Sequence, residues 1–495
     1  MPAARLSERP SSRCDRGRRA RSPASPIAAR HSRPRRPDHT SNRHLAGARP
    51  TGHLATMSDH LPLPRVRQAP TDPAFYANPY PTYAAMRGAG DLVFWEDYGF
   101  WCAAGYERVS ALLRDRRFGR EITHVATRAE LGWPEIPEHL APFYAFEAHS
   151  MLEREPPTHT RLRGLVNRAF VSRAIDRLKP TIAAIVDAAL DRMIARRGQA
   201  TTHDQRAGEP ASGLGFAAAA TGLVGAEAVD LVEAFATPVP VETICALLGV
   251  DVRLAPQMLA WSHAMVGMYQ FGRTRAEEDA AVAATLAFSE LMRGIIDARR
   301  GAPGDDLLSD LIAAADGSDR LSEDELITTA ILLLNAGHEA TVHAIANAVP
   351  LILSVEPERR PALFRDDDAT ERTVEECLRY DPPLHLFTRY ALDDVEIGPV
   401  RFRRGDRVGL LLAAANRDPD RWTIPDCFDP DRPVQPHASF GAGIHFCVGA
   451  ALARAEIGIA LPRLIDRMPR LALVCDPVRR DAYHFNGYDR LAVTW

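Results

Sequence analysis

The pattern of apolar positions predicts a chain made mainly of helices. Residues 182–197, 229–248 and 276–299 carry apolar side chains three and four positions apart, the spacing that places them on one face of an α-helix. Two short apolar runs, 92–95 and 100–102, have the composition of β-strands. Such strands are too few for a doubly wound sheet. We therefore expect a mainly α fold with a minor β portion.

The longest predicted helix runs from Glu323 to about Ser354. Ser322 and Glu325 match a capping box, in which each side chain satisfies the backbone amide of the other residue. Apolar residues occupy nearly every face of this segment, so we expect it to pass through the interior of the protein. Pro350 has no amide hydrogen and should kink or end the helix.

Charge is distributed unevenly along the chain. The first 56 of 495 residues hold thirteen arginines against three acids, although the whole chain has a formal net charge of −4. This arm has no aromatic residue to stack on a base and no apolar period, so we expect no nucleic-acid binding. We expect residues 1–56 to be a disordered extension, or sequence upstream of a true start at Met57. A single domain should then occupy residues 57–495.

The remaining composition is typical of a cytoplasmic protein. No run of about 18 apolar residues occurs near the N-terminus, so we expect no membrane span. The seven cysteines show no paired spacing, which fits free thiols in a reducing compartment. Residues 199–227 are rich in Ala, Gly and Thr without periodicity, and we expect a loop insertion there. We further expect a monomer.

One cysteine has a chemically distinctive setting. Residues 440–449 read F-G-A-G-I-H-F-C-V-G and lead into a helix-prone stretch, residues 450–456. Glycines let the backbone pass close to a flat ligand, and free amides at a helix start lower the pKa of a thiol there. Cys447 is therefore a candidate thiolate ligand of a metal. The alternative is a buried structural cysteine beside a turn.

The cysteine loop resembles the haem-ligand motif of the cytochrome P450 superfamily, F-G-x-G-x-H-x-C-x-G followed by A-L-A-R-x-E, with every fixed position filled. The resemblance covers nearly everything from about residue 70 onward. It implies the cytochrome P450 fold, with a long central helix over the haem and the cysteine loop beneath it. It also implies haem b as cofactor, Cys447 as the iron ligand, and Phe440 and Gly441 beside the cofactor.

Within the predicted long helix, the run A-G-H-E-A-T from Ala336 to Thr341 is similar to the family segment A-G-x-E-T-T. The resemblance places Ala336 and Gly337 beside the cofactor and makes Glu339 the acid of a proton path. Where the family usually has threonine this chain has Ala340, and the hydroxyl falls at Thr341, about 100° further round the helix.

Three routes could deliver protons in this arrangement. A π-bulge could bring Thr341 into place, a water chain from Glu339 could suffice, or a hydroxyl group of the substrate could complete the relay. We favour the water or substrate route. Ala340 could equally provide room for a bulky substrate.

The same resemblance implies cations for the two haem propionates: His159, Arg163, Arg389 and His445. His159 and Arg163 stand four residues apart, on one face of a predicted helix. An arginine suits a carboxylate because its planar guanidinium can donate two hydrogen bonds.

A further resemblance concerns a buried charge network behind the cysteine loop. Glu376 and Arg379 match the family's E-x-x-R pair, which Arg432 should join. We assign these three residues to folding and haem retention, because removing one partner would leave a buried charge unpaired.

The resemblance implies a monooxygenase that activates O2 and inserts oxygen, by hydroxylation or epoxidation, into a hydrophobic organic substrate. Electrons from NAD(P)H should arrive through a separate ferredoxin or flavodoxin and its reductase, steered by arginines such as Arg161 and Arg168. Alternatives are a peroxide-driven or redox-neutral haem-thiolate enzyme, and a haem-thiolate gas sensor or binding protein. The residues expected to contact the substrate are His338, Leu384, Leu386, Phe387 and Phe485.

Overall fold

The computed structural model describes the chain from residue 63 onward, with short gaps. The described residues are 63–169, 172–197, 228–270, 272–315, 321–480, 483 and 485–495. The expected extension at 1–56 and insertion at 199–227 lie outside these residues, so both stay predictions. All the described residues belong to one unit, Leu63–Trp495. Helices dominate this unit and the strands are short, which confirms a mainly α fold with a minor β portion.

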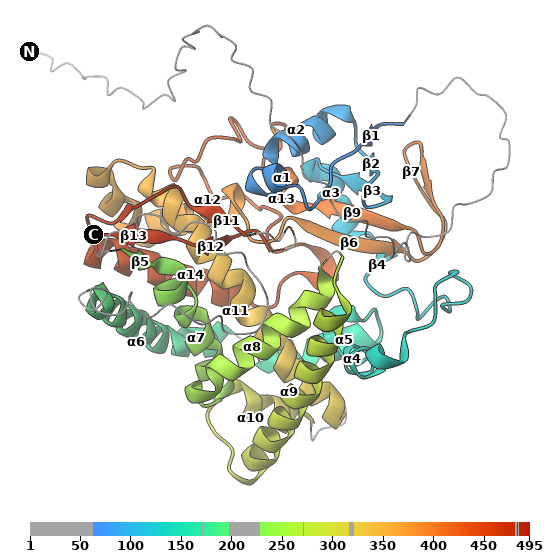
Figure 1. The fold of residues 1–495 in the computed structure, drawn as a ribbon, viewed down its shortest axis with the longest axis horizontal. Helices are drawn as coiled ribbons and strands as arrows, with labels where there is room; N and C mark the ends of the chain where they lie inside the picture. The colour runs from blue at the N-terminus through green and yellow to red at the C-terminus, as the bar shows by residue number, and fades with distance from the viewer. Residues whose placement is uncertain are drawn as a thin grey trace, which may run out of the picture. The chain divides into compact units, whose positions relative to one another are not determined.

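The helices of the described residues differ widely in length (Figure 1). They are α1 (Pro73–Ala77), α2 (Tyr80–Ala89), α3 (Tyr106–Arg114), α4 (Ala141–Glu147), α5 (Thr158–Ala169), α6 (Ser172–Arg197), α7 (Pro238–Leu248), α8 (Ala255–Val266), α9 (Arg275–Gly301), α10 (Leu307–Ala315), α11 (Glu323–Leu353), α12 (Asp367–Tyr380), α13 (Leu412–Ala415) and α14 (Ala450–Arg467).

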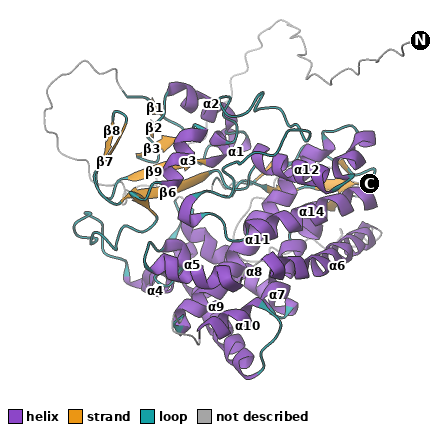
Figure 2. Ribbon diagram, turned by 180° about the vertical axis from the view of Figure 1, so that it is seen from behind, coloured by secondary structure: helices purple, strands orange, loops and turns teal. Residues whose placement is uncertain are grey.

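The strands form one mixed sheet and three smaller ones. The mixed sheet has the order β1-β2-β3-β9-β6-β4, the others β10-β13-β5, β11-β12 and β7-β8. In both views the mixed sheet lies at one end of the unit and helices α6 to α10 lie at the other (Figures 1 and 2). The strand bounds are β1 (Arg65–Val66), β2 (Val93–Trp95), β3 (Phe100–Ala103), β4 (Phe118–Gly119), β5 (Val229–Asp230), β6 (Leu386–Ala391), β7 (Val395–Ile397), β8 (Val400–Phe402), β9 (Arg407–Leu411), β10 (Ala472–Leu473), β11 (Val478–Arg479), β12 (Tyr488–Arg490) and β13 (Ala492–Thr494).

Helix α11 passes through the interior, as its all-round apolar pattern predicts. It packs against α7, α9, α12 and α14, and most of its residues are buried. The predicted capping box is present, because the Ser322 side chain accepts from the Glu325 amide and the Glu325 side chain accepts from the Ser322 amide. The helix continues past Pro350 to Leu353, so the proline does not end it. Pro350 lies in the last turn, where its missing amide affects only the end of the helix.

The prediction of one helix over residues 229–248 was wrong. This segment begins as strand β5, continues as a π-helical turn at Val232–Ala236, and becomes α-helical only at Pro238. Proline fixes its own backbone φ angle and suits the first turn of a helix, which explains the new start. The apolar spacing persists across the break because both pieces pack in the same core.

A buried charge network joins α12 to the segment that precedes the cysteine loop. Arg379 Nε and Nη2 lie 2.7 Å from Glu376 Oε2 and Oε1, and both side chains are at most 3% exposed. Arg432 Nε lies 3.3 Å from Glu376 Oε2, and the Asp429 amide donates to Oε1 at 2.9 Å. Arg379 also donates to main-chain carbonyl oxygens within residues 416–427. The structure thus brings Glu376, Arg379 and Arg432 together.

Replacing Glu376 by glutamine should destabilise the fold by about 3–5 kcal/mol, because the buried Arg379 and the largely buried Arg432 then lose their carboxylate partner. Urea unfolding followed by circular dichroism would measure the change. The control is Glu290→Gln, which removes an exposed ion pair with Arg293 and should cost at most about 1 kcal/mol. Equal unfolding midpoints for the two variants would contradict the prediction.

Candidate active site

A cavity of about 840 Å³ opens between α11, strand β6 and the loop that carries Cys447. Most of the residues singled out in the sequence lie in its wall, although they come from distant parts of the chain. They are His159, Arg163, Ala336, Gly337, Glu339, Ala340, Thr341, Leu384, Leu386, Phe387, Arg389, Phe440, His445, Cys447 and Phe485.

The cysteine loop presents the Cys447 sulfur to this cavity. The Cys447 amide donates to the Phe440 carbonyl oxygen at 3.0 Å, which closes the loop. Gly443 has a φ of +71°, and a Cβ added there would lie 2.4 Å from the Leu113 carbonyl oxygen, so the close passage requires glycine. Gly441 is not in the cavity wall. It has a φ of +69° and packs against the Phe387 ring.

The ionisation of Cys447 differs from the sequence-based expectation. Burial raises the pKa of the thiol above its ordinary value, whereas the Gly449 amide and the charges of Arg163 and Arg454 lower it. Cys447 is itself exposed to the cavity, so a haem bound there would change this balance. A coordinated metal cation would supply the missing stabilisation, since metal-bound thiols are deprotonated.

Helix α11 forms the wall that carries Ala336, Gly337, Ala340 and Thr341. It is α-helical over its whole length, all of it described, so the π-bulge route for Thr341 is not present. Thr341 Oγ1 lies 3.5 Å from the Gly337 carbonyl oxygen of its own helix. A Cβ at Gly337 would lie 2.8 Å from Ile244 Cδ1, so close packing against α7 accounts for this glycine.

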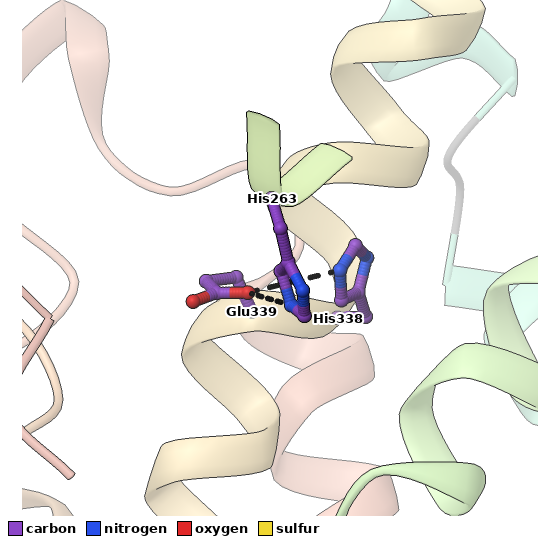
Figure 3. A group of neighbouring side chains, drawn as sticks. All are labelled: His263, His338 and Glu339. Atoms are coloured by element: carbon purple, nitrogen blue, oxygen red, sulfur yellow. Dashed lines mark ion pairs between the residues drawn. The ribbon is translucent and has the colours of Figure 1, made fainter. Parts of the chain in front are cut away.

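Glu339 is 4% exposed and is enclosed by basic side chains. Its Oε1 lies 3.0 Å from Arg480 Nη1 and 3.5 Å from His343 Nε2. Its Oε2 lies 3.2 Å from His263 Nε2 and 3.8 Å from His338 Nε2 (Figure 3). Burial raises the pKa of Glu339, but hydrogen bonds and charges from His263 and His343 outweigh it and hold the pKa well below its ordinary value. Glu339 is therefore a carboxylate.

The partners of Glu339 could not be found from the sequence. His263 belongs to α8 and Arg480 follows β11, so tertiary folding alone brings them to α11. His343 stands one helical turn after Glu339, a spacing that gives a weak local signal.

The structure corrects the expectation that His338 contacts the substrate. Its side chain lies at a second, small hollow lined by Ile244 of α7, Met258 of α8 and Phe288 of α9, not at the large cavity. Successive helical residues point about 100° apart, so His338 lies at the hollow between α7, α8 and α9, while Gly337 lies against Ile244 of α7 and in the wall of the large cavity.

Three of the predicted propionate ligands lack an acidic partner. His159 Nδ1 is buried without a hydrogen-bond partner. Arg389 is 2% exposed and donates to the Thr388 carbonyl oxygen, and burial lowers the pKa of its guanidinium to about 9. Arg163 Nε donates to Asn167. Within the described ranges, none of these three side chains has a carboxylate at ion-pair distance.

The fourth predicted cation, His445, has a partner that the sequence did not indicate. Its Nε2 lies 2.9 Å from Oε1 of the buried Glu155. Arg120, another cavity residue missed in the sequence, is paired with Glu153 at 2.5 Å. Both contacts join residues that are far apart in the chain, so no local sequence motif indicates them.

These features fit a haem. The Cys447 thiol faces the cavity, and the same cavity is lined by the guanidinium groups of Arg163 and Arg389, which lack a carboxylate partner among the described residues, and by the unpartnered Nδ1 of His159. Burial lowers the pKa of His159 to about 4, so its ring is neutral and could donate a hydrogen bond to an anionic propionate. Phe440 is the first residue of the cysteine loop, and the Arg454 guanidinium lies 4.5 Å from the centre of its ring. Elsewhere in the cavity wall, Leu384 and Phe485 are joined by a backbone β-bridge and offer apolar surface.

Among the described residues, none of the helices combines the length and the apolar character that crossing a membrane requires.

Comparisons with known proteins agree with this geometry. The cytochrome P450 family model matches residues 368–468. The cytochrome P450 monooxygenase PikC of Streptomyces venezuelae is 36% identical over 408 residues, which are 81% of this chain and 87% of that protein. The vitamin D(3) 25-hydroxylase of Pseudonocardia autotrophica is 34% identical over 85% of this chain and 94% of its own.

A solved structure extends the agreement to the fold. The structure of P450BioI in complex with hexadec-9Z-enoic acid ligated acyl carrier protein is 31% identical, has a TM-score of 0.73, and is matched over 85% of this chain and 100% of that chain. A relative above 30% identity, aligned over most of both chains, establishes the family. The chain belongs to the cytochrome P450 family and is a haem-dependent monooxygenase.

Proposed function

We propose that this monooxygenase inserts one oxygen atom of O2 into a large, mostly apolar organic molecule, with electrons from a separate ferredoxin or flavodoxin and its reductase. The observation that carries the proposal is the placement of Cys447 and the Glu339–Ala340 turn of α11 in the wall of one cavity. The haem, when bound, supplies the reductive activation of dioxygen. Cys447 would hold the iron, and His159, Arg163 and Arg389 would hold the propionates.

The cavity wall supports an apolar substrate. Leu384, Leu386, Phe387 and Phe485 lie together in it, contributed by β6, by Leu384 just before that strand, and by the segment of Phe485 that bridges to Leu384. A vitamin D(3) 25-hydroxylase is among the relatives, and hexadec-9Z-enoic acid accompanies a structural neighbour. Both of these molecules are largely hydrocarbon, which agrees with the lining.

The face proposed for docking of the electron donor includes α5, which carries both candidate arginines. Arg161, which we expected to steer the partner, is paired with Glu325. Arg168 is exposed at the end of α5. Arg168 is therefore the better candidate, because an exposed cation attracts an acidic partner over a longer range than a paired one.

We assign Glu339 to proton delivery. It is a buried carboxylate at the cavity wall, while the position one residue on presents only the methyl group of Ala340. The hydroxyl of Thr341 contacts the Gly337 carbonyl oxygen of its own helix, at 3.5 Å, and the Glu456 carboxyl group of α14. Water or a substrate hydroxyl must then take the place of the missing side-chain hydroxyl.

A peroxide-driven reaction is the second candidate, and Ala340 is the observation that favours it. Turnover with peroxide, but none with NAD(P)H and a reductase system, would establish that alternative. A gas-sensing role has no support from the monooxygenases that this chain resembles.

Replacing Cys447 by serine should abolish the red-shifted Soret band of the reduced carbon monoxide complex, because that band requires sulfur to donate electron density to iron. Absorption spectra of the purified, reduced protein would measure it. Cys475→Ser is the control, since Cys475 is an exposed cysteine outside the cavity wall. An unchanged band in the Cys447 variant would refute the assignment.

Ala340→Thr should change the ratio of product formed to NAD(P)H consumed, because it places a hydroxyl next to Glu339 at the cavity wall. Ala340→Val is the matched control, since valine adds the same bulk without the hydroxyl. If both variants change the ratio equally, Ala340 provides space only. If neither changes it, Ala340 has no part in proton delivery.

Largely hydrocarbon compounds should displace water from the iron, which appears as a saturable spin-state change in the absorption spectrum. A compound library arranged in pairs of similar size, one apolar and one highly polar, would test the substrate class. A response confined to the polar members would contradict the proposed apolar substrate while leaving the iron ligand unaffected.

A further inference from the structure

Three side chains converge beside the large cavity, on the side of α11 that faces α8 (Figure 3). His263 comes from α8, and His338 and Glu339 come from α11. One ligand atom from each lies within 4.8 Å of the other two. In the part of the chain that the structure describes, no other group of three His, Cys, Asp or Glu side chains has this geometry.

The tautomer of His338 leaves a lone pair aimed into this group. Its Nδ1 lies 2.7 Å from the Leu334 carbonyl oxygen, which can only accept, so Nδ1 carries the proton. In the neutral ring Nε2 is then unprotonated; it is buried without a hydrogen-bond partner and faces Glu339 Oε2 at 3.8 Å. Two acceptor atoms that face each other in a buried site are unfavourable unless a positively charged group lies between them.

Contacts behind the group orient two of its members. The Leu334 carbonyl fixes the His338 ring, and Arg480 holds Glu339 by Oε1, at 3.0 Å, while Oε2 faces His263 and His338. Metal-ligating histidines and carboxylates are commonly held in this way by hydrogen bonds to their other polar atom. The charge of Arg480 is partly balanced by Asp489, whose Oδ1 lies 3.5 Å from Arg480 Nε.

We propose that His263 Nε2, His338 Nε2 and Glu339 Oε2 form a binding site for Zn²⁺. Tetrahedral zinc with nitrogen and oxygen ligands at about 2.0–2.2 Å places neighbouring ligand atoms about 3.4 Å apart. The observed separations from Glu339 Oε2, 3.2 Å to His263 and 3.8 Å to His338, lie on either side of this value. Two histidines and one glutamate leave the fourth position open to water.

The site also has an entry path and a chemical preference. The His263 side chain is 53% exposed, so a hydrated ion can reach it from solvent before it engages the buried pair. Imidazole nitrogen favours zinc and its transition-metal neighbours, whereas Mg²⁺ and Ca²⁺ require six or more oxygen ligands. The site therefore selects against the abundant hard cations.

Occupation of the site would inhibit the enzyme. This consequence rests on the proposed function of Glu339 in proton delivery, because a metal on Oε2 takes the carboxylate out of the proton path. Zinc should then lower the fraction of NAD(P)H electrons that appear in product. The binding itself does not depend on that function.

The test uses the full-length haem protein without a histidine tag, freed of metal by a chelator that is then removed. Titration with ZnCl2 in a calorimeter should give one saturable site, and MgCl2 should give none. Crystals soaked in ZnCl2 should show an anomalous peak at the zinc absorption edge between the three side chains. The absence of saturable zinc binding would overturn the proposal.

His263→Ala is the decisive variant, because this half-exposed residue can be removed without opening the core. It should weaken zinc binding at least about tenfold, since loss even of an outer contact costs that much. His139→Ala is the matched control: His139 also pairs with a carboxylate, Glu278 at 2.8 Å, outside the three-ligand group. The carbon monoxide spectrum reports that each variant retains its haem. Equal zinc affinity in the wild type and His263→Ala would refute the site.

Turnover measurements distinguish the zinc site itself from the proposed role of Glu339 in proton delivery. Zinc should lower the ratio of product to NAD(P)H in the wild type and have at least about tenfold less potency in His263→Ala. If zinc binds stoichiometrically and His263→Ala abolishes binding, but the wild-type ratio is unchanged, the metal site stands. The proposed role of Glu339 is then contradicted.

Discussion

The structure depends on holding one sulfur atom in the wall of a cavity that α11 also lines, although loop and helix are far apart in the sequence. The loop can do this because Gly443 lets the main chain pass against Leu113, and because the Cys447 amide closes the loop onto Phe440. The Glu376 network anchors the preceding segment to α12, which packs on α11. The position of the sulfur relative to α11 therefore depends on α12.

Buried charges in this enzyme fall into two groups with different meanings. Glu376 and Arg379 satisfy each other within the protein, so their burial costs little further and they serve the fold. Arg389 and His159 are buried in the cavity wall without such partners. Leaving a cation or a polar atom unsatisfied is costly, and the cost is recovered when an anionic ligand arrives. Buried polar groups that are paired within the protein therefore belong to the fold, and those without a partner in the cavity wall belong to the ligand site.

Features that depend on contiguous residues could be predicted from the sequence. The capping box of α11, the cysteine loop and the Glu376–Arg379 spacing are each contained in a few positions, and each is present in the structure. Features created by contacts between distant segments of the chain could not be predicted in this way. The apolar periodicity did not show the break before Pro238, since the segments on both sides of it pack in one core. The A-G-H-E-A-T motif singled out Glu339 but not its partners His263 and Arg480. The same limit explains His338, whose direction depends on which neighbour covers each face of α11.

The surroundings of Glu339 constrain how protons could pass it. Hydrogen bonds and charges from His263 and His343 stabilise the charged form of this carboxylate, which is why its pKa is lowered despite burial, and Arg480 lies 3.0 Å from its Oε1. Such a group rarely carries a proton, so it is better suited to accept hydrogen bonds and orient a water than to act as the proton donor. In a family member with threonine at the next position, that hydroxyl could hold the water from the other side. Ala340 has no hydroxyl, so in the proposed proton path the second contact comes from the substrate or from further water. Proton delivery and substrate fit are then coupled, because a substrate that leaves the wrong space beside Ala340 also leaves the water without its partner.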